Sequence, residues 1–154
     1  MNPIHRNEAL KPLSREHHQG LLLCWKIRTG FSKRIEISLM KSYADWFYKN
    51  YLLPHFDIEE KYVFSILGNE HELVKRALAE HRKLKRLFEN ENEVAKRLGL
   101  IEELLEAHIR FEERVLFNEI QKIATPKELE KMELMHENRN NHKEPEAWKY
   151  EFWK

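Results

Sequence analysis

The chain has 154 residues, of which 42% are hydrophobic and 34% charged, and its formal net charge is +1. This length fits one domain that buries its own core without disulfide bonds. Four glycines and five prolines are few for a β architecture, which needs many turns, so the composition favours helices. A balance of charges this close to neutral gives no sign of a nucleic-acid-binding or anionic-membrane-binding surface.

The sequence shows no targeting or membrane signal. Its single cysteine, Cys24, cannot form an internal disulfide and fits a reducing compartment. The first residues contain no apolar stretch of signal-peptide length, and no apolar run is long enough to span a bilayer. We therefore expect a soluble, cytoplasmic protein that binds neither nucleic acid nor membrane.

The chain is expected to begin with a polar, proline-containing arm over residues 1–12. A first helix follows over about 15–29, with Ser14 as its start and Gly30 as its stop signal. Its apolar residues recur at helical spacing, so one side of it is expected to face a core.

Three further long helices are predicted from the same periodicity. The second covers about 33–67, and Pro54 predicts a kink or short break within it, because proline removes an intrahelical hydrogen bond. The third covers about 70–98, Gly99 is expected to break the chain, and the fourth covers about 100–123. Four long helices with short connections predict an all-α, up-down-up-down four-helix bundle.

A shorter fifth helix is predicted after the bundle. Thr125 is a suitable N-cap followed by a proline, and the helix is expected to run to about His136 outside the bundle. The chain then divides into the arm, a bundle over 13–123, and a C-terminal helix with an aromatic tail over 124–154. The aromatic cluster at 148–153 is expected either to dock on its own domain or to meet a partner, including another copy of the chain.

A histidine followed four residues later by a glutamate occurs twice, as His55 with Glu59 and as His108 with Glu112. Residues four apart lie on one face of a helix, so each pair can aim an imidazole and a carboxylate at one point. One such pair on a solvated helix face would carry little weight. Two pairs, each within an apolar stripe, favour a cluster of two transition-metal ions.

The first and third helices each add an inward histidine. His17 shares a stripe with apolar residues and is expected to point inward, whereas His18 projects about 100° away. His81 is the only polar member near the middle of its stripe; alone it would more often be a satisfied core residue, but the two pairs favour a ligand role. The candidate metal ligands are His17, His55, Glu59, His81, His108 and Glu112. The residues expected at the surface are Glu60, Glu113, His5, His71, His136 and His142.

Four imidazoles and two carboxylates from four helices can hold two ions if the carboxylates are shared. A glutamate on an inner helix face is costly to bury without a partner, and a metal ion would remove that cost. Zinc, manganese and iron each suit this ligand set, and the spacing does not choose among them.

The order and spacing of these residues resemble the haemerythrin-like domains, also called HHE cation-binding domains, over about residues 10–123. The resemblance implies a four-helix bundle that holds two iron ions in a non-haem centre with an oxo- or hydroxo-type bridge. It implies the four histidines as terminal ligands and Glu59 and Glu112 as bridging ligands. The segments that carry it are Leu13-Ser-Arg-Glu-His17, Pro54-His-Phe-Asp-Ile-Glu-Glu60, Glu80-His-Arg-Lys-Leu84 and His108-Ile-Arg-Phe-Glu-Glu113.

The sequence departs from the oxygen-carrying members of that family. They have a further histidine four residues from the one on the third helix, where this chain has Ala77 and Lys85 around His81. The resemblance therefore implies a di-iron protein that engages O2, NO or a related small ligand for sensing, scavenging or iron handling. The alternative is a di-iron redox enzyme that reduces peroxide or NO, or repairs iron–sulfur centres, with electrons from a partner. A purely structural metal bundle is a third reading.

Overall fold

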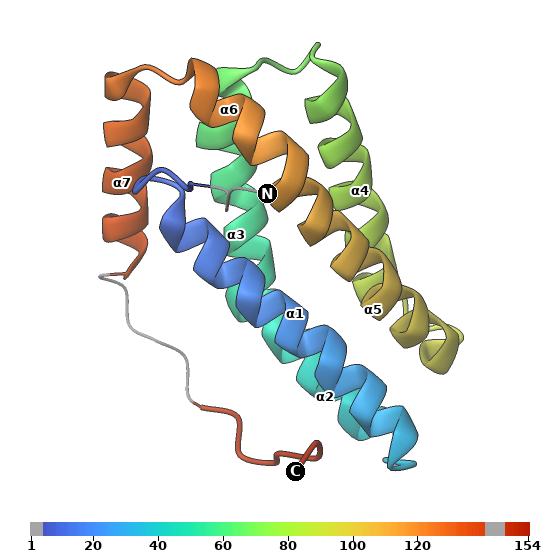
Figure 1. Ribbon diagram of the computed structural model, residues 1–154. Helices are drawn as coiled ribbons and strands as arrows, with labels where there is room; N and C mark the ends of the chain where they lie inside the picture. Colours follow the sequence, from blue (N-terminus) through green and yellow to red (C-terminus); the bar gives the residue numbers. More distant parts are fainter. Residues whose placement is uncertain (1–4, 141–146) are drawn as a thin grey trace.

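In the computed structural model, the described residues, 5–140 and 147–154, form five helices and no strand (Figure 1). Four helices make the predicted up-down-up-down bundle, and the additional C-terminal helix lies beside it. His142, expected at the surface, and residues 1–4 of the expected arm lie outside the described residues. The helices that are described all fall short of the length and apolar character needed to cross a membrane.

The first helix, α1 (Lys11–Ser32), is longer at both ends than the expected 15–29. It begins early because Pro12 suits the first helical turn, where its missing N–H would have no intrahelical partner. Ser14 is therefore not the helix cap, and its hydroxyl donates to Glu113 Oε2 at 2.9 Å.

Gly30 does not end α1 but is buried within it. A Cβ atom at this position would lie 2.9 Å from side-chain atoms of Met40 and Phe152. The glycine therefore permits close packing of the second helix and of the C-terminal tail. The chain turns just beyond the helix, where Arg34 adopts a φ of 57° and the Ile35 N–H donates to the Gly30 carbonyl at 2.9 Å.

The second long segment is helical throughout but changes its winding. The predicted break at Pro54 takes the form of a π turn that ends directly before the turn that carries the proline. A second π turn begins at Glu59, and the segment closes with a short 3₁₀ turn. In order, the parts are α2 (Ile37–Phe47), η1 (Tyr48–Leu52), α3 (Leu53–Ile58), η2 (Glu59–Val63) and η3 (Phe64–Ile66).

The break between the third and fourth helices does not fall at Gly99, as predicted. α4 (Glu72–Glu89) ends ten residues before that glycine, which lies inside α5 (Val94–Phe111). The Asn90 side chain accepts the Asn92 N–H at 2.8 Å. Asparagine side chains that bond nearby backbone compete with helical hydrogen bonding, so the chain breaks here instead.

The fourth helix continues from α5 through a π turn, η4 (Glu112–Leu116), into α6 (Phe117–Ile123). α7 (Pro126–Asn140) then runs past the predicted end and packs against η2. Its start is the predicted cap: Thr125 Oγ1 accepts the Glu128 N–H at 3.2 Å, and the Glu128 carboxylate accepts the Thr125 N–H at 2.9 Å.

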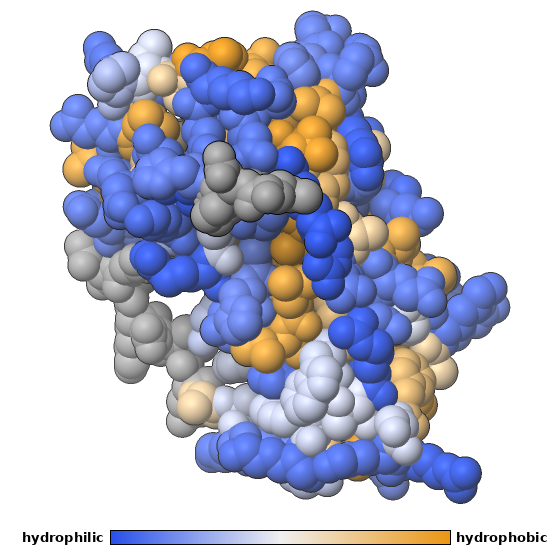
Figure 2. Space-filling model, viewed as in Figure 1, coloured by the Kyte–Doolittle hydropathy of each residue, from blue (hydrophilic) through white to orange (hydrophobic). Residues whose placement is uncertain are grey.

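Two hydrophobic clusters fill the bundle, one toward each end. On α1, Leu13 belongs to one cluster and Leu23 to the other, and His17 lies between them. On the other three bundle helices the candidate ligands likewise lie at the junction between residues of the two clusters, so a buried polar layer separates them. The tail packs against the cluster around Leu23 through Phe152, which is 3% exposed. Figure 2 shows that the face of the molecule in this view is mainly hydrophilic, with hydrophobic areas between the hydrophilic ones.

Candidate metal centre

The polar layer gathers the six candidate ligands from all four bundle helices. Each is at most 3% exposed, although four are histidines and two are glutamates. In each four-residue pair the histidine lies in a regular helix and the glutamate begins a π turn. The contributing residues are His17 on α1, His55 on α3, Glu59 on η2, His81 on α4, His108 on α5 and Glu112 on η4.

These side chains form two overlapping groups that share both glutamates. The first half-site is His17 and His55 with Glu59 and Glu112, and the second is His81 and His108 with the same glutamates. Within each group one possible ligand atom per residue lies within 4.8 Å of every other. Glu59 Oε2 lies 3.2 Å from His55 Nε2, and Glu59 Oε1 lies 3.2 Å from His81 Nε2. Two carboxylates shared between two pairs of imidazoles make the geometry of a binuclear site.

Most of the atoms that face the centre lack hydrogen-bond partners. Among the buried atoms without one are Nε2 of His17 and His55 and all four carboxylate oxygens of Glu59 and Glu112. In the second half-site the Nε2 atoms of His81 and His108 face each other at 3.1 Å. Leaving such groups unpaired is costly, and a cation between them satisfies every one. The residues present therefore fit a pair of metal ions.

The outer nitrogen of every site histidine is held by a carboxylate from another helix. Nδ1 of His55 lies 2.7 Å from Glu16, and that of His17 lies 2.8 Å from Glu113. The second half-site repeats the arrangement at 2.7 Å in both cases, with Glu60 on His81 and Glu80 on His108. A carboxylate at Nδ1 fixes the proton there and turns the Nε2 lone pair toward a metal. The four outer carboxylates are Glu16, Glu60, Glu80 and Glu113.

Glu60 and Glu113 were expected to be surface charges, and the structure corrects this. Both are only about 30% exposed at the side chain and both hold a site histidine. Both lie beside the inner stripe of their helix, so their carboxylates contact a histidine on a neighbouring helix instead of facing the centre. A signal was available in the sequence, since every outer carboxylate stands directly beside a candidate ligand. Glutamate precedes His17 and His81, and glutamate follows Glu59 and Glu112.

The imidazoles and carboxylates of the layer shift each other's pKa values in opposite directions. Burial lowers the pKa of His17 and His81, but the carboxylates around each ring, Glu112 foremost, outweigh it and raise both values well above 6.5. Burial raises the pKa of Glu112, yet His108 and the other imidazoles bring it well below 4.5. The layer thus requires positive charge, from protons or from a metal that displaces them.

Aromatic rings cover the histidines. The Phe56 ring stacks on His81 with centroids 3.8 Å apart, and Phe64 lies 5.4 Å from the same imidazole. Phe117 stacks on His17 at 5.2 Å. Sequence analysis missed these rings, although HFDIEEKYVF and HIRFEERVLF each place a phenylalanine five residues after the shared glutamate. The rings exclude water and orient the imidazoles.

His136 is buried, at 3% exposure, and not at the surface as expected. It lies on α7, and its Nε2 is 3.4 Å from Glu16 Oε2, whose other oxygen accepts from His55. The C-terminal helix therefore touches the support of the first half-site. The burial of His136 depends on where α7 packs against the bundle. The spacing of residues within a single helix does not predict this. His5, His71 and His18 are exposed, as expected.

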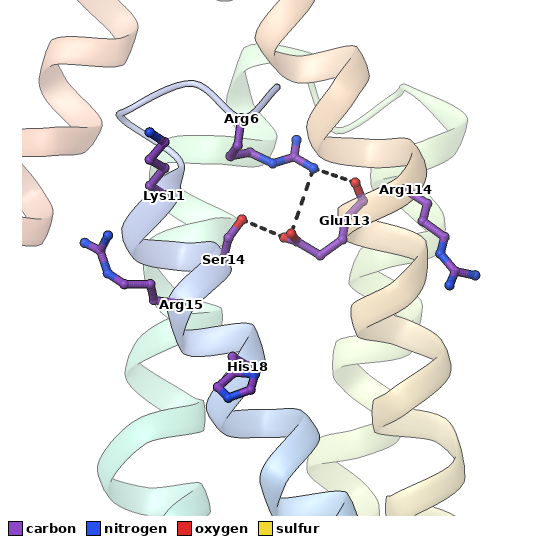
Figure 3. A pocket seen from close by; sticks show the side chains of 7 residues that line it. All are labelled: Arg6, Lys11, Ser14, Arg15, His18, Glu113 and Arg114. Carbon is purple, nitrogen blue, oxygen red and sulfur yellow. Dashed lines mark hydrogen bonds and ion pairs between the residues drawn. The ribbon is translucent and has the colours of Figure 1, made fainter. Parts of the chain in front are cut away.

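A groove of about 460 Å³ opens on the outer side of Glu113 (Figure 3). Arg6 and Ser14 point toward the Glu113 carboxylate, and Arg6 also donates to the Glu113 backbone carbonyl at 2.6 Å. His18 lines this groove instead of facing the metal layer. Its remaining lining is cationic, from Lys11, Arg15 and Arg114.

Fold and site together define a helical bundle with a buried His/Glu site for cations. A family model described as the Hemerythrin HHE cation binding domain matches residues 8–120. The chain belongs to this family, so the resemblance read from the sequence is confirmed. A search among curated proteins gave no significant match, and neither did a search among solved structures.

Proposed function

We propose that the protein binds two iron ions and through them engages O2, NO or a related small ligand. The observation that carries the proposal is the pair of overlapping half-sites, in which Nε2 of His17 and His55 and the carboxylate oxygens of Glu59 and Glu112 have no hydrogen-bond partner. Two ions that share Glu59 and Glu112 would use all six ligands and keep positions free. Imidazole and carboxylate together suit iron, and membership of the family favours it over zinc or manganese.

The chain's own residues prepare this centre in three ways. The outer carboxylates hold each imidazole by Nδ1, which fixes its orientation and raises its basicity. Phe56, Phe64 and Phe117 exclude water from the imidazole faces. Glu59 and Glu112 supply buried negative charge that a bound cation must balance. Iron, when bound, supplies redox activity and coordination of a small ligand.

The test is metal analysis of protein expressed with ample iron and purified without air, followed by visible spectra before and after O2 or NO. Two irons per chain with a reversible spectral change support ligand engagement. Catalytic consumption of peroxide or NO with a reductant would identify a redox enzyme instead. Protein that holds only zinc, or no metal, under these conditions would refute the iron centre.

A further inference from the structure

A second cavity, of about 360 Å³, lies away from the metal layer between the C-terminal tail and the helices α1 and α2 with η1. Its volume falls within the range of small-molecule pockets, roughly 300–1,000 Å³. Six aromatic side chains line it. They are Tyr43, Trp46, Phe47, Tyr51, Trp148 and Trp153.

The rings stand around the cavity and do not fill it. Tyr43 has ring centroids 5.5 Å from Trp148 and 4.9 Å from Trp153. Trp46 lies 5.5 Å from Trp148 and 5.4 Å from Tyr51. These contacts are tilted or edge-on, and rings in such contacts leave part of their faces uncovered by one another. Such faces bind flat ring systems by stacking.

One residue of the tail is buried more deeply than the two tryptophans beside it. Phe152 is the anchor, because its ring is buried against Gly30 and Met40, where even a Cβ atom would collide. Trp148 and Trp153 flank this anchor and remain only partly buried. Tryptophan faces left beside an open cavity are costly in water unless something covers them.

The polar groups of the cavity select against charged ligands. Lys26 Nζ lies 4.0 Å from the Trp153 ring centroid and donates to the Tyr43 hydroxyl at 2.8 Å. It therefore already takes the position in which a cationic ligand would meet the rings. Glu151 also lines the cavity and offsets the charge of Lys26, so an anion gains little. Gln19 adds an amide that can donate and accept.

We propose that this cavity binds a planar, uncharged aromatic ring system with hydrogen-bonding atoms at its edge, the chemistry that flavin and quinone rings share. The proposal rests on the cavity alone and holds whether or not iron is the metal. The two helices that line it also carry site histidines: Gln19 is two residues beyond His17, and Tyr51 is one turn before His55.

The cavity contains its own reporter, because three of the four tryptophans line it and Trp25 on α1 does not. We would titrate the full-length, metal-loaded protein with riboflavin, follow tryptophan emission corrected for absorption, and confirm the stoichiometry by calorimetry. Saturable binding of one riboflavin per chain is expected. Trp148→Ala should weaken it about tenfold or more, as expected for loss of one stacking face, and Trp148→Phe should restore most of it.

Trp25→Ala is the matched control and should keep the affinity, since this residue is 47% exposed outside the cavity. Choline, a cation without a ring, should not bind. Failure of both riboflavin and the quinone menadione to bind would overturn the proposal. Equal affinity in wild type and Trp148→Ala would also overturn it, as would choline binding more tightly than riboflavin.

Discussion

The two half-sites share both glutamates but differ in what stands behind their histidines. In the second, the outer carboxylates are braced by cations of the bundle: Lys85 lies 3.7 Å from Glu60, and Arg76 lies 3.1 Å from Glu80. Both cations are on α4. In the first, the support reaches outside the four bundle helices, because Glu113 contacts Arg6 and Glu16 contacts His136.

The second half-site is therefore built within the bundle, whereas the first depends on the segments before α1 and after α6. Arg6 precedes α1, and His136 lies on α7. Support from outside a bundle can move without unfolding it. We expect changes in these segments to weaken the first half-site alone, and changes in the shared glutamates to affect both.

The largest effect is expected from Glu112→Ala, which removes a carboxylate common to both half-sites and leaves imidazoles facing one another. Both metal ions should be lost, as measured by metal analysis of purified protein. Glu103→Ala is the matched control, because Glu103 is an exposed glutamate on the same helix. Normal metal content in Glu112→Ala would show that the carboxylate is not a shared ligand.

Neighbouring histidines give the next test. His17→Ala should remove the ion of the first half-site and keep that of the second, halving the metal content. His18→Ala should bind metal as wild type does, because this exposed residue lines the groove. If His18→Ala proved the worse variant, α1 would be rotated by one residue from its place here.

Acidification should release the metal. His17 and His81 have pKa values well above 6.5 without metal, so each must lose a proton to bind it. Each displaced proton weakens the apparent affinity about tenfold per pH unit below the relevant pKa. Affinity measured by competition with a chelator should therefore fall steadily as pH decreases.

Above about pH 6.5, stability should respond to pH in opposite directions with and without metal. The raised pKa of His17 and His81 means that their contribution in metal-free protein is complete below pH 6.5 and lost as pH rises through the folded-state values. The lowered pKa of Glu112 gives a contribution complete above pH 4.5. Metal-free protein should thus have its highest Tm between these values, whereas Tm of loaded protein should rise with pH. Parallel pH profiles would contradict this.

Smaller effects are expected from the outer carboxylates. Glu113→Gln and Glu80→Gln keep size but lose charge, and each should weaken metal binding by about 10–100-fold. Glu113→Gln should act on the first half-site and Glu80→Gln on the second, which stepwise metal titration would separate. Equal effects on both binding steps from either variant would show that the half-sites are not independently supported.

The smallest effect should come from the outside supports. His136→Ala and Arg6→Ala should each weaken the first half-site by less than about tenfold, because they act through Glu16 and Glu113. Lys131→Ala on the exposed side of α7 controls for the helix itself. If His136→Ala also lost metal from the second half-site, the two half-sites would not differ in their dependence on α7.

Periodicity within single helices predicted the bundle and the inner layer. His55 with Glu59, and His108 with Glu112, meet as the four-residue spacing requires, although their role as ligands stays a prediction. Contacts between residues on different helices could not be predicted from periodicity within one helix. The partner of Glu60 is on α4, and the burial of His136 depends on the docking of α7.

The wrong helix break has a local cause. Gly99 was expected to end a helix because glycine lowers helix stability, by about 1 kcal/mol relative to alanine. That cost is small beside the packing of an apolar face, so α5 continues through it. The Asn90 side chain, which offers the backbone an alternative partner, marks the actual break.

The π turns that begin at Glu59 and Glu112 have a consequence for insertions and deletions. Each lets a phenylalanine five residues further on, Phe64 or Phe117, lie over an imidazole instead of one residue out of phase. Deleting one residue after Glu60 or Glu113 from either π turn would give a regular helix in which the phenylalanine follows the glutamate by four residues and keeps its direction, because i+4 in an α turn and i+5 in a π turn lie on the same face. Inserting one residue would instead swing the ring about 100° away, so the centre should tolerate a deletion in these turns better than an insertion.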